Sequence, residues 1–249
     1  MDMTDALSSP SVAPAGDAPS PFAAIDADMV REAVRRGRGG ASSDFDLLPG
    51  GRASFPPAGA PLRQAGVLCP LVDRGDGLRV ILTRRADHLR QHAGQVAFPG
   101  GRVDPTDPSL LHAALREADE EIGLAAHQVD IFGAIDGHET GTGYAITPFV
   151  GLVASDFAPR SDPSEVAEVF EPPLAFLMDP ANRRTESRYF QGRDRRYYAM
   201  PWEGRYIWGA TARMLVGLSD RLAELLDEAG LGGGLRDLRD GARPPHGPG

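Results

Sequence analysis

Residues 100–124 read GGRVDPTDPSLLHAALREADEEIGL, and this stretch decides what the surrounding chain is expected to form. Successive residues of an α-helix rotate by about 100°, so Glu117, Glu120 and Glu121 fall within one arc of about 100°. The apolar residues fall on a separate arc that can face a hydrophobic core; they are Leu111, Ala114, Leu115, Ala118 and Ile122. The stretch therefore predicts a helix with one buried side and one carboxylate side.

The ends of this helix carry their own signals. A Gly100-Gly101 pair, typical of a turn, precedes it. Asp107 followed by Pro108 predicts the start, because Asp is a favoured N-cap and Pro is favoured at the first helical position. Gly123 predicts the end, because glycine readily adopts the left-handed conformation that closes many helices.

The three carboxylates repel one another unless a positive group lies among them. Arg116 offsets part of that repulsion, and a divalent cation would offset more, because hard cations such as Mg²⁺ and Mn²⁺ prefer carboxylate oxygen. A solvated acidic helix face is the structural alternative. The glycine turn, the Arg-Glu pair and the glycine after the acids lie in one frame and favour a metal site.

Composition narrows the function classes. The 249-residue chain has a net charge of −9 and a pI near 5.1, which argues against a nucleic-acid-binding surface. A single cysteine, Cys69, excludes an intrachain disulfide. No stretch approaches the roughly 20 apolar residues of a membrane span, and the start of the sequence lacks the pattern of a secretory signal. We expect a cytoplasmic enzyme with a small-molecule substrate and without a nucleic-acid or membrane partner.

The chain divides into four parts by composition. Residues 1–24 are rich in Ala, Pro, Ser and Asp and are predicted to be disordered. Residues 25–59 should hold a short helix and irregular coil, residues 60–229 the folded domain, and residues 230–249 a loose tail. Within the domain, hydrophobic patterns predict strands over 65–72, 78–83, 95–98, 129–137, 144–153 and 168–170, a hairpin over 189–200 closed by 206–208, a short helix over 173–178, and a long one over 210–228. Mixed strands flanked by helices predict an α/β/α sandwich with a mixed sheet.

The stretch that opens this section resembles the Nudix box, G-x5-E-x7-R-E-U-x-E-E-x-G-U, in which U is aliphatic. The matching residues are Gly101, Arg116, Glu117, Ala118, Glu120, Glu121, Gly123 and Leu124. Fourteen residues separate Gly101 from Arg116, where the pattern has thirteen, and the glutamate of its first half is absent. Asp104 and Asp107 are the nearby acids.

A longer resemblance points to one branch of that family. Residues 81–101, ILTRRADHLRQHAGQVAFPGG, are similar to the motif L-L-T-x-R-[SA]-x3-R-x3-G-x3-F-P-G-G of the coenzyme A pyrophosphatase branch, and only Ile81 differs. That branch also tends to carry the longer box with Asp in its first half. The segments SEVAEVFEPPL and IWGATARML resemble it too, so the resemblance covers about residues 60–228.

The resemblance implies a Nudix-type sandwich and a Mg²⁺- or Mn²⁺-dependent hydrolysis of the diphosphate of coenzyme A or acyl-CoA. The products would be 4′-phosphopantetheine, or its acyl form, and adenosine 3′,5′-bisphosphate. Glu117, Glu120 and Glu121 would be metal ligands, together with the carbonyl of Gly100. Arg116 would pair with one of these glutamates and hold it in place.

Other residues receive roles by the same comparison. Nudix enzymes commonly take a further glutamate from a later loop, so Glu165 joins Glu120 and Glu121 as a catalytic residue, with Glu168 second and Glu139 third in preference. Substrate phosphates would contact residues that precede the glycine turn, because arginine binds phosphate in a bidentate manner; these are Arg84, Arg85, Arg90 and Gln95.

Two other functions stay open at this point. One keeps the chemistry and changes the substrate to ADP-ribose, NADH or another nucleoside diphosphate derivative. The other is a Nudix-like nucleotide-binding module without catalysis, against which the complete Arg-Glu-Glu-Glu set argues. The oligomeric state is open as well, with a homodimer as one arrangement.

Overall fold

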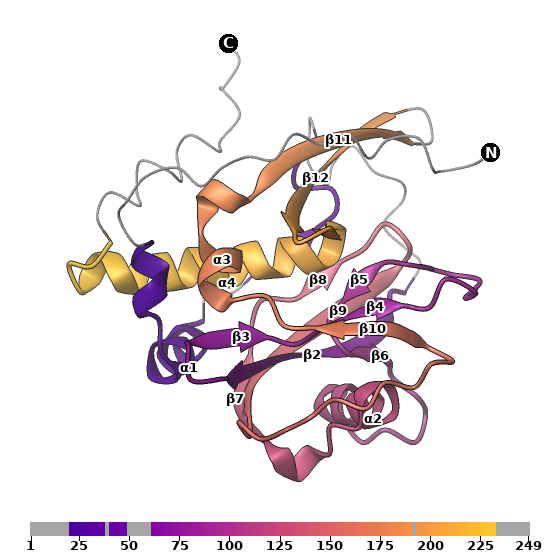
Figure 1. Cartoon of the computed structure of the whole chain (residues 1–249). Helices are drawn as coiled ribbons and strands as arrows, with labels where there is room; N and C mark the ends of the chain where they lie inside the picture. Colours follow the sequence, from indigo (N-terminus) through magenta and orange to yellow (C-terminus); the bar gives the residue numbers. More distant parts are fainter. Residues whose placement is uncertain (1–19, 38–39, 49–60, 191–192, 233–249) are drawn as a thin grey trace.

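The computed structural model describes residues 20–37, 40–48, 61–190 and 193–232. The predictions of disorder for residues 1–19 and of a loose tail for residues 233–249 lie outside this range. None of the described helices is long and apolar enough to cross a membrane. Figure 1 shows the element order, in which runs of consecutive strands are separated by single helices.

The main sheet is mixed and is built around strand β2 (Arg63–Asp73), which is parallel to β9 (Tyr144–Val153) along its whole length. Strands β3 (Leu78–Val80) and β6 (Gly100–Arg102) pair antiparallel with β2. Strands β7 (Val129–Ala134) and β8 (His138–Glu139) pair antiparallel with β9, and β1 (Ser42–Ser43) pairs parallel with β8.

Two smaller antiparallel sheets complete the strand content. The first joins β10 (Val166–Phe170), β4 (Leu82–Arg85) and β5 (Val96–Ala97), in that spatial order. The second joins β11 (Arg184–Phe190), β12 (Arg193–Trp202) and β13 (Arg205–Trp208). Strand β10 pairs only with β4, so it forms an edge of its sheet.

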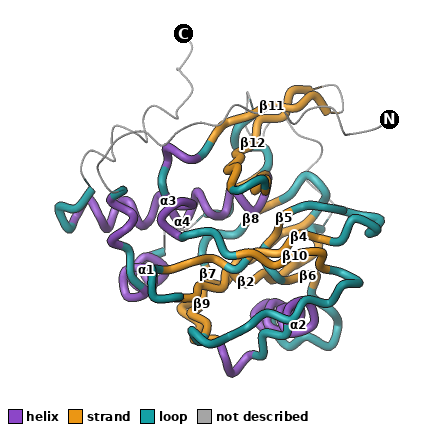
Figure 2. The backbone as a smooth tube through the Cα atoms, in the orientation of Figure 1, coloured by secondary structure: helices purple, strands orange, loops and turns teal. Residues whose placement is uncertain are grey.

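Helices cover both faces of the main sheet (Figures 1 and 2). Helix α2 (Leu110–Ile122) lies on one face, while α1 (Ala27–Arg36), α3 (Leu174–Met178) and α4 (Gly209–Glu228) lie on the other. Strand β2 shows why, because its side chains alternate between faces. Leu68 and Val72 are buried in the cluster that contains Ile122 of α2, whereas Cys69 and Leu71 are buried in the cluster that contains Leu222 of α4. The predicted α/β/α sandwich with a mixed sheet is confirmed.

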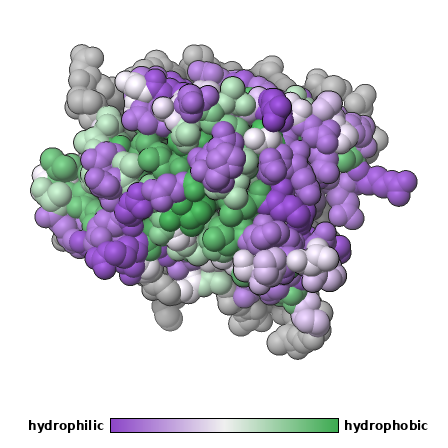
Figure 3. Space-filling view, turned by 90° about the horizontal axis from the view of Figure 1, so that it is seen from below, coloured by the Kyte–Doolittle hydropathy of each residue, from purple (hydrophilic) through white to green (hydrophobic). Residues whose placement is uncertain are grey.

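The side on which α2 lies faces the viewer in Figure 3, where an apolar area is surrounded by hydrophilic residues. Apart from Glu121, the buried residues of α2 are small or aliphatic, which lets the helix approach the sheet closely. Gly66 of β2 is the point of closest approach, because a Cβ there would lie 2.1 Å from the carbonyl oxygen of Leu110.

Several predicted boundaries are wrong. Residues 21–24, predicted as disordered, form a short 3₁₀-helix that buries Phe22. The irregular segment after α1 contains β1, where the ring of buried His138 contacts Ser42 Oγ and Asp44 Oδ1, each at 2.9 Å. The predicted strand 78–83 breaks at Ile81 into β3 and β4, which belong to different sheets.

The predicted start of α2 is also wrong. The N-cap is Ser109, whose side chain accepts a hydrogen bond from the backbone N–H of His112 at 3.1 Å. Asp107 does not cap the helix because Arg116 binds its carboxylate. The predicted end is confirmed, since Gly123 adopts the left-handed conformation with φ of 70°.

Candidate active site

The glycine turn brings strand β6 against both β2 and helix α2. Gly100 has φ of 142°, and a Cβ there would lie 2.5 Å from the Cα of Val67. A Cβ on Gly101 would lie 2.6 Å from the carboxyl carbon of Glu117. Neither approach is open to a residue with a side chain unless its neighbours move. The two glycines therefore let the acidic side of α2 touch the backbone of the turn.

Glu121 is the most deeply placed acid of this helix. Its side chain is 3% exposed, and one oxygen accepts a hydrogen bond from the Gly100 N–H at 3.2 Å. The other oxygen lies 3.5 Å from Nη1 of Arg85. Burial raises the pKa of Glu121 to about 8, although Gly100 and Arg85 both act to lower it. The carboxyl is thus held where its charge is poorly compensated.

Glu117 lies beside Glu121, one helical turn earlier. Its side chain is 20% exposed, and burial raises its pKa, with nearby Glu120 and Glu165 adding to the effect and Arg116 opposing it. The charges of Glu117 and Glu165 also raise the pKa of Glu121. The acids face one another, and a bound cation would relieve their repulsion.

Arg116 is the cationic centre of the acidic side. Its guanidinium donates to both oxygens of Asp107, from Nε at 3.1 Å and from Nη2 at 3.0 Å. It also contacts Glu120 at 2.9 Å and Glu117 at 3.1 Å. Asp107 is 1% exposed and is held further by His112 at 2.9 Å. The hydrogen bonds from Arg116 keep the pKa of Asp107 well below its usual range, so this pair is fully charged.

Asp107 is a residue that sequence reasoning assigned to the wrong role. It was expected to cap the helix, but it anchors Arg116 nine residues later. The missing first glutamate of the motif was a signal, since a nearby acid was needed to balance the arginine. That signal pointed to Asp104 and Asp107 together and did not choose between them. Asp104 lies at the limit of contact, 4.0 Å from the guanidinium.

The donor set suits a hard divalent cation, because carboxylate and carbonyl oxygens are its preferred ligands. Glu121 and Glu117 are the raised-pKa carboxylates that such an ion would stabilise. Within the described ranges, no three Asp, Glu, His or Cys side chains are already close enough together to hold a metal ion. The 59% exposed side chain of Glu120 lies against Arg116. To complete the set, Glu120 would have to leave that contact.

The three later glutamates occupy different places. Glu165 directly precedes β10, is exposed, and lies close enough to Glu117 and Glu121 to raise the pKa of both. Glu168 contacts Arg205 at 2.9 Å and Arg84 at 3.7 Å. Glu139 lies in β8, which is separated from β2 by β9. Of the three, Glu165 is the one that the structure brings to the acidic side of α2.

Arg84 and Arg85 point in opposite directions because they are neighbours in strand β4. Arg85 faces α2 and contacts Glu121 at 3.5 Å. Arg84 faces the other side, where it contacts Asp87 at 2.8 Å and Glu168 at 3.7 Å. The two arginines were assigned to the substrate together, but the structure brings only Arg85 to the carboxylates of α2.

The connection between β4 and β5 carries the remaining predicted substrate residues. Arg90 is exposed at the surface of this connection. Gln95 is half-buried, its side chain lies 2.9 Å from Nδ1 of His92, and its carbonyl accepts from the N–H of Arg85 at 3.0 Å. Gln95 therefore helps to fix the strand from which Arg85 reaches Glu121.

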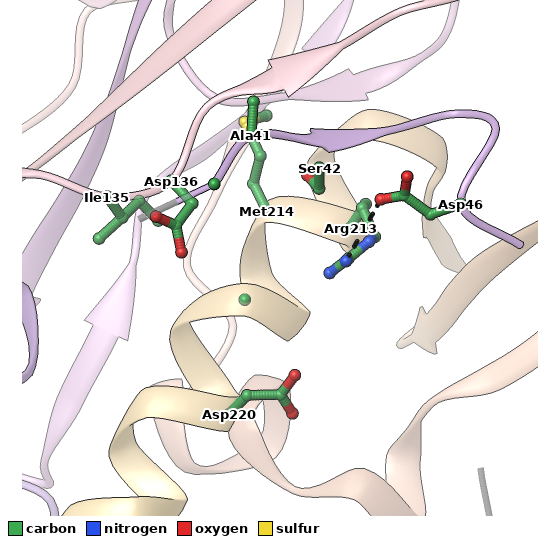
Figure 4. A pocket seen from close by; sticks show the side chains of 10 residues that line it. Ala41, Ser42, Asp46, Ile135, Asp136, Arg213, Met214 and Asp220 are labelled. Atoms are coloured by element: carbon green, nitrogen blue, oxygen red, sulfur yellow. Dashed lines mark ion pairs between the residues drawn. The ribbon is translucent and has the colours of Figure 1, made fainter. Parts of the chain in front are cut away.

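Two cavities lie away from these carboxylates. The smaller, of about 160 Å³, is lined by residues of α4 and of the segments around β1 and β7. Figure 4 shows Arg213 directed toward Asp46, at 3.6 Å, with Asp136 and Asp220 on other walls. None of the residues of the glycine turn or of α2 lines it. The larger, of about 580 Å³, lies along the end of β10 and is lined in part by Phe170 and Trp202.

The chain is similar to several known proteins. The NUDIX domain model matches residues 62–190. A protein of Yersinia pestis (strain Pestoides F) described as uncharacterized Nudix hydrolase NudL is 40% identical over 161 residues, which are 65% of this chain and 80% of that protein. NudL of Yersinia pseudotuberculosis (serotype O:1b, strain IP 31758) gives the same values. Among solved structures, the MutT protein of Methanosarcina mazei Go1 is 21% identical, with 68% of this chain and 96% of that one covered and a TM-score of 0.41.

The family match covers half of the chain, and the matched segment contains the glycine turn and every acid of α2. The identity to the Yersinia proteins extends over most of their length. This protein therefore belongs to the Nudix family and is a Nudix hydrolase.

Proposed function

We propose that this Nudix hydrolase cleaves the diphosphate of coenzyme A or acyl-CoA, giving 4′-phosphopantetheine, or its acyl form, and adenosine 3′,5′-bisphosphate. One observation carries the proposal. The contact between Arg85 and Glu121 brings a guanidinium of the coenzyme A-type motif, residues 81–101, to the carboxylates of the acidic helix. A diphosphate bound there would meet a guanidinium from the motif and the carboxylates of α2.

The cofactor in this proposal is Mg²⁺ or Mn²⁺. Glu117, Glu121 and the Gly100 carbonyl would hold it, joined by Glu120 after its release from Arg116. A divalent cation bound there would neutralise the diphosphate and lower the pKa of a coordinated water. The raised pKa values of Glu117 and Glu121 support this assignment, since they mark carboxylates that lack compensating charge.

The chain's own residues divide the remaining work. Arg116, anchored by Asp107, keeps Glu117 in position. Arg85 and Arg90 bind the diphosphate oxygens, and Gln95 fixes the strand that carries Arg85. Glu165, exposed beside the acids, accepts the proton of the attacking water at a carboxylate oxygen. The water oxygen forms a bond to phosphorus, and the bond from that phosphorus to the bridging oxygen breaks to leave two phosphomonoesters.

Arg84 has weaker support as a direct substrate contact than its neighbour. Its side chain faces Glu168 on the opposite side of β4. Arg84 would contact the substrate only if the bound molecule extended around the edge of the sheet formed by β10, β4 and β5. Arg84→Ala should therefore cost less activity than Arg85→Ala.

The nearest rival keeps the acids and changes the substrate to ADP-ribose, NADH or another nucleoside diphosphate derivative. The site of α2 would serve equally well there, because every such substrate contains a diphosphate. The second rival is a nucleotide-binding module without catalysis. The complete set of Arg116, Glu117, Glu120 and Glu121 argues against it, because binding alone does not require this charge cluster.

A substrate panel separates these functions. The protein is incubated with Mg²⁺ and either coenzyme A, acetyl-CoA, ADP-ribose or NADH, and the products are identified by mass spectrometry. We expect the fastest turnover with a coenzyme A compound, and both phosphomonoester products. Faster turnover of ADP-ribose or NADH would overturn the substrate assignment. Failure to cleave any of the four, with metal bound, would favour the binding module.

A further inference from the structure

The larger cavity holds a set of side chains that the reaction at α2 does not use. It measures about 580 Å³ and opens along the end of strand β10. Its walls combine the aromatic residues Phe170 and Trp202, the guanidinium groups of Arg79 and Arg205, and Ser161 of the preceding loop. Trp202 and Arg205 come from β12 and β13, which lie beyond the segment that the family model matches.

The aromatic wall is a stack with a cation over it. The rings of Phe170 and Trp202 lie 5.9 Å apart and within 14° of parallel. The guanidinium carbon of Arg205 is 4.9 Å from the centre of the Phe170 ring and 5.2 Å from that of Trp202. Phe170 is 5% exposed and lies at the buried end of the stack, while Trp202 is partly exposed. A flat ring can therefore extend this stack at Trp202.

The two arginines keep donors available. Arg79 donates to both oxygens of Asp76 and to the carbonyl of Glu171. Arg205 donates twice to Glu168 and once to the carbonyl of Glu203. A guanidinium has five N–H groups, so each arginine has two beyond these bonds. Fixed guanidinium forks with spare donors are suited to a phosphate group.

The acids around the cavity do not cancel this preference. Glu171 lines the cavity, but Arg74 binds both oxygens of its carboxylate from outside. Asp76, Glu168 and Glu203, whose carboxylates pair with Arg79 or Arg205, do not line it. The lining itself therefore carries two arginines and one carboxylate, and Arg74 compensates the charge of that carboxylate.

The loop that forms one wall of the cavity also contacts the end of helix α2. Its loop wall includes Ser161, and the neighbouring N–H groups of Arg160 and Asp162 bind the carbonyls of Ile122 and Glu121 at 2.9 and 3.0 Å. At its other wall, β10 runs from Phe170 back to Glu165, a distance of about 16 Å at 3.3 Å per residue. One substrate can thus reach from α2 to this cavity along the edge of β10.

We infer that this cavity binds the phosphorylated adenosine end of the substrate, with the purine on Trp202 and the 3′-phosphate between Arg79 and Arg205. The inference rests on the proposed function and adds a specificity site to it. A substrate without the 3′-phosphate loses the arginine contacts and keeps the purine stack.

The substitution Ser161→Glu tests this site. Ser161 is exposed and lines the cavity, so the new glutamate would place a negative charge at the cavity wall. Ser161→Lys reverses the charge at the same position, and Ser155→Glu makes the same change at an exposed residue outside the lining. We expect Ser161→Glu to raise the KM for coenzyme A about fivefold relative to that for dephospho-coenzyme A, at a similar kcat. Ser161→Lys should lower the same ratio, and Ser155→Glu should leave it unchanged.

A binding measurement separates this inference from the proposed function. Adenosine 3′,5′-bisphosphate and adenosine 5′-monophosphate are titrated into the full chain in EDTA by calorimetry. We expect the bisphosphate to bind more tightly, with the difference reduced in Ser161→Glu. The protein could hydrolyse coenzyme A while the Ser161 variants change neither the KM ratio nor the preference for the bisphosphate. That result would overturn the inference and leave the proposed function intact. Bisphosphate selectivity without coenzyme A hydrolysis would reject the function and retain the cavity's specificity. An effect of Ser161→Glu that grows with acyl-chain length would overturn the inference, because it would place the acyl arm in the cavity.

Discussion

Replacing Glu121 by Gln should stabilise the protein at alkaline pH in the absence of metal. The same substitution should abolish activity when Mg²⁺ is present. The carboxyl is 3% exposed, and burial raises its pKa from 4.5 to about 8. Because the folded-state pKa is raised, the favourable contribution of the protonated carboxyl is complete below pH 4.5 and is lost as the pH rises to about 8. Gln has the shape of the protonated acid and cannot ionise, so the variant escapes that loss.

The size of the effect follows from the pKa. Each pKa unit corresponds to about 1.4 kcal/mol, so ionisation of Glu121 costs about 5 kcal/mol above pH 8 and under about 1 kcal/mol at pH 5. Other titrating groups are common to both proteins and cancel in the difference. The measured advantage of Glu121→Gln should therefore grow by several kcal/mol between pH 5 and pH 8.5.

Urea denaturation in EDTA, at pH 5 and pH 8.5, measures this difference directly. Glu120→Gln is the matched control: its side chain is 59% exposed, so its effect on stability should stay within about 1 kcal/mol at both pH values. Adding Mg²⁺ at pH 8.5 should stabilise the wild type more than Glu121→Gln, because the variant lacks a ligand charge. A Glu121→Gln protein less stable than wild type at pH 8.5 would refute the reasoning.

Three further predictions concern the same site. Glu120→Gln should lower kcat by about a hundredfold or more with an unchanged melting temperature, and an unchanged kcat would remove Glu120 from the ligand set. Gly101→Ala should lower kcat and Mn²⁺ affinity by displacing Glu117, whose carboxyl carbon would lie 2.6 Å from the new Cβ. The free energy of unfolding should change by only about 1 kcal/mol, because the flexible end of the Glu117 side chain can move. Wild-type kinetics in this variant would disprove the close contact. Arg85→Ala should reduce kcat/KM for coenzyme A and dephospho-coenzyme A equally, because both contain the diphosphate, and a loss restricted to coenzyme A would assign Arg85 to the 3′-phosphate instead.

Hydrophobic periodicity was sufficient to predict most of the fold. The strand predicted over residues 144–153 matches β9, and the long helix predicted over 210–228 begins one residue earlier in the structure. These elements have strong local patterns, so tertiary contacts did not need to override them. The break at Ile81 was not predictable, because a continuous apolar run does not reveal that its two halves join different sheets.

The start of α2 shows a different limit. Asp107 and Ser109 are both good capping residues, and the local sequence favours Asp107 because Pro108 follows it. The choice is made by Arg116, which draws the Asp107 carboxylate away from the helix end. That competition depends on a contact nine residues away, which propensities do not contain.

Candidate site residues could be predicted where a sequence motif contains them. They were harder to predict where the role depends on which face of a strand a side chain lies on. The acids of α2 follow from helical spacing. Arg84 and Arg85 were grouped because they are adjacent in sequence, yet strand alternation separates them. Arg205 was missed altogether, since its contact with Glu168 spans 37 residues and requires β10 and β13 to meet. Such contacts follow from topology and could not be obtained from spacing.

The central claim is that the acids of α2 form a cation site. Anomalous diffraction at the manganese edge, from crystals grown with Mn²⁺ and a non-hydrolysable diphosphate analogue, tests it most directly. We expect a peak within coordination distance of Glu117 and Glu121, with Glu120 turned away from Arg116. A fully occupied analogue without manganese beside these carboxylates would contradict it.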